Sequence, residues 1–124
     1  MTPVLLKNPI NLSSDDLNSV SPVSRPIGEP VSIMRSKVVF KSSTNATCAG
    51  VWECSPGRWR RQVAEAEFST FLSGRCTFTP DDGPSIDLEA GDSIYFHPNT
   101  NGEWNIIETV RKAYVILPEV HQPV

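Results

Sequence analysis

Closely spaced turn signals constrain the fold of this chain more than any other feature. Eleven prolines and seven glycines interrupt its 124 residues, and beyond residue 50 the interruptions become regular. They fall at residues 55–57, 73–74, 80–83, 90–92 and 99–102. Short strands separated by turn signals at such intervals are typical of sandwiches and barrels. The pattern therefore predicts an all-β protein.

The segments between the turns have the composition of strands, because β-branched and aromatic residues are frequent in them. The predicted strands are residues 34–41, 49–54, 59–63, 68–72, 93–96, 104–107 and 113–117. The sharpest turn is TPDDG at residues 79–83, where proline presets φ and glycine supplies a positive φ. It predicts a hairpin between strands near residues 75–79 and 85–88. Residues 64–67 have helical propensity, but we predict no helix there because the apolar run that follows ends at Ser73-Gly74.

Residues 1–30 differ from the rest in being rich in Pro, Ser and Asn. We predict that they form an N-terminal arm or linker before a single domain at residues 31–124. Ser14, as N-cap of two aspartates, predicts one short helix that ends near Val20. The run SPVSRP at residues 21–26 predicts an extended linker.

Two interpretations of the arm remain open. It is either loosely ordered or docked across a partner subunit, because Val4-Leu5-Leu6 and Ile10 are apolar enough to need cover.

Composition argues against several classes of partner. The length suits one hydrophobic core, and 39% hydrophobic residues, 20% charged residues and a net charge of −3 are ordinary for a globular domain. Arg58-Trp59-Arg60-Arg61 is too small a cluster for a nucleic-acid groove. The first ten residues lack a signal-peptide pattern, and no run approaches the roughly 20 apolar residues of a membrane span. We therefore expect a cytoplasmic protein without nucleic-acid or membrane partners.

Three cysteines, Cys48, Cys54 and Cys76, are odd in number and follow no CxxC spacing. This pattern argues against both a disulfide framework and a zinc site. We expect reduced thiols, and we expect Cys54 and Cys76 to pack as small apolar residues.

Five motifs lie between Gly50 and Tyr114: GVWECSPGRWRR at 50–61, EFSTFLSG at 67–74, GDSIYF at 91–96, GEW at 102–104 and ETVRKAY at 108–114. Taken together, they resemble the small cupins grouped with ureidoglycine aminohydrolase. The resemblance implies a double-stranded β-helix, which is an antiparallel jelly-roll barrel. It also implies a pocket in the barrel mouth and a homodimer.

The resemblance implies a set of metal-ligand positions, and this chain has other residues at most of them. The enzyme of that family holds manganese through a Glu, two His and a Gln, and the equivalent positions here are Arg61, Val63, Glu67 and Gly102. A divalent cation needs several oxygen or nitrogen ligands, and only Glu67 supplies one. We therefore expect no metal and no cofactor.

Glu67 is the strongest candidate for a buried functional group. Side chains alternate along a strand, so Glu67 shares a face with Ser69 and Phe71 and enters the barrel. A buried carboxylate needs a partner, and Arg61 is the predicted one, in a two-pronged ion pair. The predicted ligand pocket comprises Arg61, Glu67, Tyr95 and Trp104. His97 is interpreted as a rim residue, His121 as a solvated tail residue, and Trp52 and Trp59 as core.

These residues predict a metal-independent module that binds a polar small molecule. Catalytic residues are not assigned, and whether the protein is an enzyme stays open. One alternative is a metal-dependent hydrolase, related to ureidoglycine aminohydrolase, that acts on a nitrogenous metabolite with ligands in another register. Another is a dimeric structural or regulatory protein whose barrel is filled by side chains.

Overall fold

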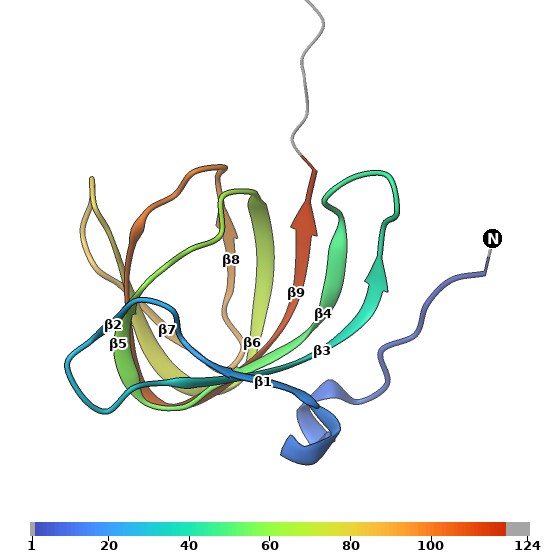
Figure 1. Ribbon diagram of the computed structural model, residues 1–124, viewed down its shortest axis with the longest axis horizontal. Helices are drawn as coiled ribbons and strands as arrows, with labels where there is room; N and C mark the ends of the chain where they lie inside the picture. The colour runs from blue at the N-terminus through green and yellow to red at the C-terminus, as the bar shows by residue number, and fades with distance from the viewer. Residues whose placement is uncertain (1, 119–124) are drawn as a thin grey trace, which may run out of the picture.

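Nine strands form one strongly curled sheet in the computed structural model, which describes residues 2–118 (Figure 1). The strands are β1 (Ser19–Pro22), β2 (Pro26–Ile27), β3 (Ile33–Lys41), β4 (Cys48–Cys54), β5 (Gly57–Arg60), β6 (Ala66–Pro80), β7 (Ile86–Glu89), β8 (Ser93–Phe96) and β9 (Gly102–Leu117). All their pairings are antiparallel. The predicted all-β jelly-roll fold is confirmed.

Two long strands, β6 and β9, give the sheet its barrel shape. They pair along their whole length, and each carries different neighbours on its two halves: β8 and β7 on β6, β4 and β5 on β9. The register shifts repeatedly between Phe71 and Cys76, where the ribbon bends. Gly74 lies at this bend with φ at +83°, and an added Cβ would collide with the Thr109 carbonyl. The bend therefore requires glycine.

The sequence pattern predicts shorter strands than the structure contains, because the middle of each of these two long strands is polar. Residues 104–107 and 113–117 were predicted as separate strands, yet both belong to β9. Glu108 and Thr109 are exposed at the bend, where the register shifts but the strand continues. The predicted hairpin is confirmed, with β6 and β7 paired from Arg75–Glu89 to Phe78–Ile86.

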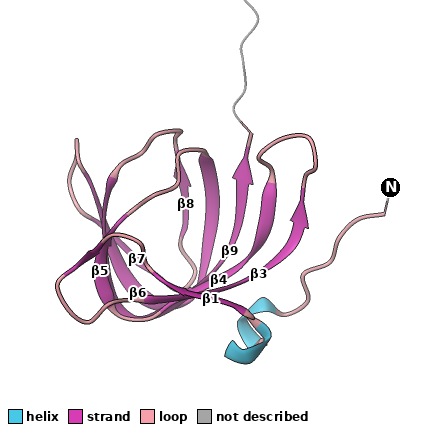
Figure 2. Cartoon of the chain, viewed as in Figure 1, coloured by secondary structure: helices cyan, strands magenta, loops and turns pink. Residues whose placement is uncertain are grey.

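The N-terminal segment is more ordered than the sequence predicted. The helix expected from Ser14 to Val20 is wrong: a single 3-10 turn, η2 (Ser14–Asp16), is capped by the Ser13 hydroxyl, and β1 begins at Ser19. A second 3-10 turn, η1 (Pro9–Asn11), precedes it, and both turns lie outside the barrel (Figure 2).

The stretch predicted as an extended linker contains sheet edges. β1 pairs with β3 and β2 pairs with β5, at the two ends of the strand order. Pro22 and Pro26 are compatible with these places because an edge strand leaves some N–H groups unused. Leu17 and Val23 are buried, and this burial draws the segment onto the barrel.

Aromatic rings form much of the barrel core. Trp104 is central, with its ring centroid 4.9 Å from that of Phe78, 5.7 Å from that of Phe96 and 6.3 Å from that of Phe71. Cys54 and Cys76 are buried in this core as free thiols, as predicted. None of the helical turns in residues 2–118 is long and apolar enough to cross a membrane.

Candidate functional site

A cavity of about 190 Å³ opens into the barrel between the sheet and the segment that follows β1. Apolar and aromatic side chains supply most of its wall, and a few charged groups interrupt them. The lining residues are Val23, Ser24, Met34, Trp52, Trp59, Arg61, Gln62, Val63, Glu67, Trp104, Lys112 and Tyr114. Three of the four predicted pocket residues, Arg61, Glu67 and Trp104, therefore meet here.

Glu67 is the buried carboxylate of this cavity, with its side chain 4% exposed. The prediction that it faces inward with Ser69 and Phe71 is confirmed, since all three are buried. Its Oε2 accepts hydrogen bonds from Ser69 Oγ at 2.5 Å and from Lys112 Nζ at 2.7 Å. Lys112, which was not among the predicted pocket residues, is therefore the main charged partner of Glu67.

Arg61 is buried beside Glu67 and forms the predicted ion pair with it, but through one contact and not in the predicted two-pronged geometry. One contact of 3.5 Å joins Arg61 Nη2 to Glu67 Oε1. Arg61 Nη1 instead donates to the carbonyls of Val63 and Thr100, at 2.8 and 3.0 Å. The guanidinium also stacks 4.1 Å from the ring centroid of Phe96. The shortest hydrogen bonds of Arg61 therefore go to backbone carbonyls, and they link the segments that contain Val63 and Thr100.

Lys112 is a buried residue of the cavity wall that the sequence motifs did not single out. Its ammonium lies 2.7 Å from Glu67, and 4.5 Å and 5.3 Å from the ring centroids of Trp52 and Trp104. These distances are typical of cation–π contacts. Alternation along β9 was the available signal, because Lys112 shares a face with Trp104. Lysines are ordinarily exposed at the surface, so the residue type by itself did not predict a buried position for Lys112.

Tyr95, the fourth residue of the predicted ligand pocket, does not line this cavity. It is 46% exposed and makes an edge-on contact with the His97 ring, 4.9 Å between centroids. Its neighbour Phe96 is buried, and alternation turns Tyr95 outward. His97 is exposed at the end of β8, as expected of a rim residue, whereas His121 lies outside the described residues.

The residues at the expected metal-ligand positions do not fit a divalent cation. Both oxygens of Glu67 face cations, Lys112 and Arg61. At Gly102 an added Cβ would lie 2.5 Å from the Phe78 ring, so a ligand side chain there would collide with the core. In the described part of the chain, no three His, Cys, Asp or Glu residues form a group that could hold a metal. The carboxylate of Glu67 is therefore occupied by protein cations.

Charge and burial set the protonation states in the cavity. Burial alone would raise the pKa of Glu67, but the charge of Lys112, hydrogen bonds from Lys112 and Ser69, and the charge of Arg61 lower it below its ordinary value. Burial raises the pKa of Cys54 to about 11 and that of Cys76 to about 12. Glu67 is therefore ionised at neutral pH, and the two thiols remain protonated.

Acid is expected to destabilise the protein through Glu67. Because the folded state lowers this pKa, the ionised carboxylate contributes stability above pH 4.5, the ordinary value. That contribution is lost as the pH falls from there through the lower folded pKa. Urea unfolding between pH 7 and pH 3 should show the wild type losing more stability than Glu67→Gln. Parallel pH profiles for the two proteins would contradict this assignment.

Comparisons with known proteins agree with the fold. Residues 42–114 match the model of the EutQ-like cupin domain. A Pseudomonas syringae protein of unknown function is similar at 23% identity and a TM-score of 0.68, over 83% of this chain and 46% of that one. This chain thus spans less than half of that relative.

Two further solved structures are similar. The Clostridium difficile EutQ protein has 17% identity and a TM-score of 0.62, over 77% of both chains. A Thermotoga maritima protein has 22% identity and a TM-score of 0.52, over 67% of this chain and 100% of that one. The search of curated proteins found no match. Structural likeness at such identities shows the fold, and the match over residues 42–114 shows the family: the chain belongs to the EutQ-like cupin domain family.

Proposed function

We propose that this protein binds a polar small molecule in the barrel cavity and needs no metal to do so. One observation carries the proposal: a buried carboxylate and two buried cations, Glu67, Lys112 and Arg61, share one cavity with tryptophan rings. Concave, largely apolar sites with a few placed polar groups are typical of ligand pockets. A cavity of about 190 Å³ also counts against a barrel filled by side chains.

The hydrolase alternative has less support. Membership of the ureidoglycine aminohydrolase group rests on the motifs alone, and its reaction requires a bound manganese ion. Here Lys112 and Arg61 hold the carboxylate that a metal would need. We therefore favour direct binding by protein groups.

A thermal-shift screen of small metabolites tests the proposal. A ligand at 100 times its dissociation constant should stabilise the protein by about 2.7 kcal/mol, whether the buffer holds EDTA or Mn²⁺. Met34→Trp, which puts a larger side chain into the cavity wall, should abolish the shift. Tyr95→Ala, outside the cavity, should preserve it. Shifts that require Mn²⁺ would favour the hydrolase, and the absence of any shift across the screen would overturn the proposal.

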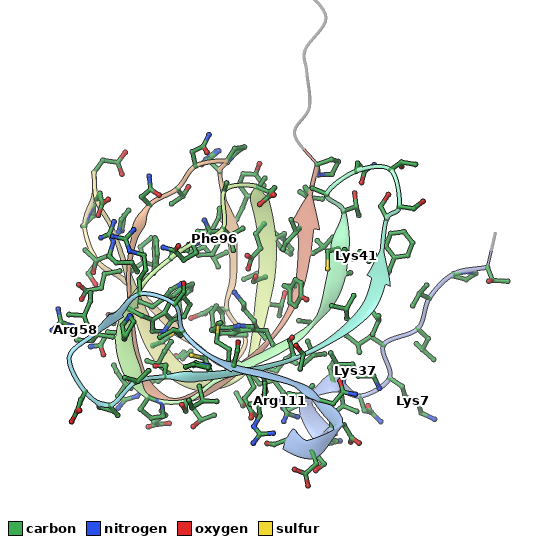
Figure 3. All side chains as sticks on the ribbon, in the orientation of Figure 1. Lys7, Lys37, Lys41, Arg58, Phe96 and Arg111 are labelled. Carbon is green, nitrogen blue, oxygen red and sulfur yellow. The ribbon has the colours of Figure 1, made fainter. Side chains whose placement is uncertain are left out.

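We also propose that the protein forms a homodimer. Val38 and Phe40 on β3 are 48% and 45% exposed, and Val4 and Leu5 of the N-terminal arm are 56% and 79% exposed. β1 covers β3 only from Ile33 to Ser36, so the strand beyond it, flanked by Lys37 and Lys41, lies open (Figure 3). Exposed apolar side chains of this kind mark interaction surfaces.

Light scattering at tens of micromolar protein should report twice the mass of one chain. Phe40→Glu should give a monomer. Ile107→Glu, at a residue 44% exposed on β9, serves as the matched control and should stay dimeric. A monomeric wild type at these concentrations would remove the proposal.

A further inference from the structure

We infer that the ligand of this cavity is a small monoanion: a carboxylate on a flat apolar body about one ring in size, recognised by Lys112 and Tyr114. This inference rests on the proposed function and specifies its ligand class. It follows from the charge balance, the free donors and the shape of the cavity.

The buried charges at the cavity do not balance. Arg61 and Lys112 are 5% and 6% exposed, and the one carboxylate among them, Glu67, is 3% exposed. Glu53 does not compensate, because Arg111 Nη2 holds it at 2.8 Å. Glu65 attracts Arg61, but it is only partly buried. The cavity wall therefore carries an excess positive charge, which favours an anion and repels a cation.

Two donors at the wall, Lys112 and Tyr114, have hydrogen-bonding capacity that the residues described in the structure do not fill. Lys112 carries three N–H groups; one bonds Glu67, and the ammonium otherwise faces the rings of Trp52 and Trp104. The Tyr114 hydroxyl has Cys48 Sγ, at 3.9 Å, as its hydrogen-bond partner among residues 2–118. Lys112 and Tyr114 are two residues apart on β9, so they share the face that lines the cavity. Burial raises the pKa of Tyr114, so its hydroxyl remains a donor.

The rest of the wall selects the body of the ligand. Trp52, Trp59 and Trp104 meet with centroid separations of 6.0–6.4 Å. A flat ring can pack against such faces. A dry cavity of about 150 Å³ holds one benzene molecule, and this cavity measures about 190 Å³. One ring with a carboxylate is therefore the fitting size.

Calorimetry on the full chain with matched probes tests the inference. Benzoate, phenylacetate and nicotinate should each bind about tenfold or more tightly than their neutral amides, because a charge-assisted hydrogen bond replaces a neutral one. Benzylamine, which is a cation, should bind more weakly than the acids and more weakly than the amides. If no acid binds more tightly than its amide while other compounds still shift the melting temperature, the anion inference fails and the proposed function stands. If nothing binds the cavity, both fail.

A pair of hydroxyl deletions separates recognition from folding. Tyr114→Phe should weaken benzoate binding by about tenfold and benzamide binding by less, because a hydrogen bond to a neutral acceptor is weaker than one to a carboxylate. Tyr95→Phe removes the same group from an exposed ring outside the cavity and should leave both affinities unchanged. Equal benzoate affinities in the two variants would overturn the role of Tyr114.

Discussion

Glu67→Ala is expected to lower the free energy of unfolding by about 3–5 kcal/mol, the usual cost of breaking a buried ion pair. The substitution leaves Lys112 buried against aromatic rings with no carboxylate, and it removes the acceptor of the Ser69 hydroxyl. It also removes the one anionic contact of Arg61 seen within the described residues. Urea unfolding at pH 7 measures the loss.

The matched control for this effect is Glu108→Ala. Glu108 is paired with Arg75 at 3.4 Å, but its side chain is 62% exposed, so the change should stay within about 0.5 kcal/mol. A similarly small change for Glu67→Ala would mean that Glu67 is not buried with partners, and the assignment of the cavity would fall.

Double substitutions identify the dominant partner. Glu67→Leu with Lys112→Met should recover more of the lost stability than Glu67→Leu with Arg61→Met. In the first case the remaining cation, Arg61, keeps the carbonyls of Val63 and Thr100. In the second case Lys112 keeps only aromatic faces. Equal recovery would contradict the geometry of the site.

Trp104→Ala is the second substitution with a large expected effect, a loss of about 3–5 kcal/mol. Trp104 is 1% exposed and contacts aromatic rings from four strands, so truncation leaves a void that the surrounding side chains cannot fill. The enlarged cavity should also bind ring-shaped ligands less selectively. Chemical denaturation measures the stability, and calorimetry with benzoate and benzamide measures the selectivity.

Tyr95→Ala is the aromatic control for Trp104→Ala. Because Tyr95 is 46% exposed on the outer face of β8, its truncation should cost about 1 kcal/mol or less. Equal losses at the two positions would mean that the core does not centre on Trp104.

Local patterns in the sequence determined most of the fold. Turn chemistry at residues 79–83 predicted the β6–β7 hairpin, and alternation predicted the inward direction of Glu67. Both signals act between residues close together in the chain. The motifs likewise indicated the cupin fold and the loss of the usual metal ligands at Arg61, Val63 and Gly102.

Contacts between distant residues decided the rest. The nearest cation to Glu67 is Lys112, from another strand. Arg61 makes one longer contact with Glu67 and donates to the carbonyls of Val63 and Thr100. Local propensity predicted a helix and a linker in the N-terminal segment. The segment instead pairs with the sheet, because this arrangement buries Leu17 and Val23. An inward-facing carboxylate in a strand predicts that a counter-charge lies nearby. Which cation it is depends on the closed barrel, because strands distant in sequence become neighbours only in the assembled sheet.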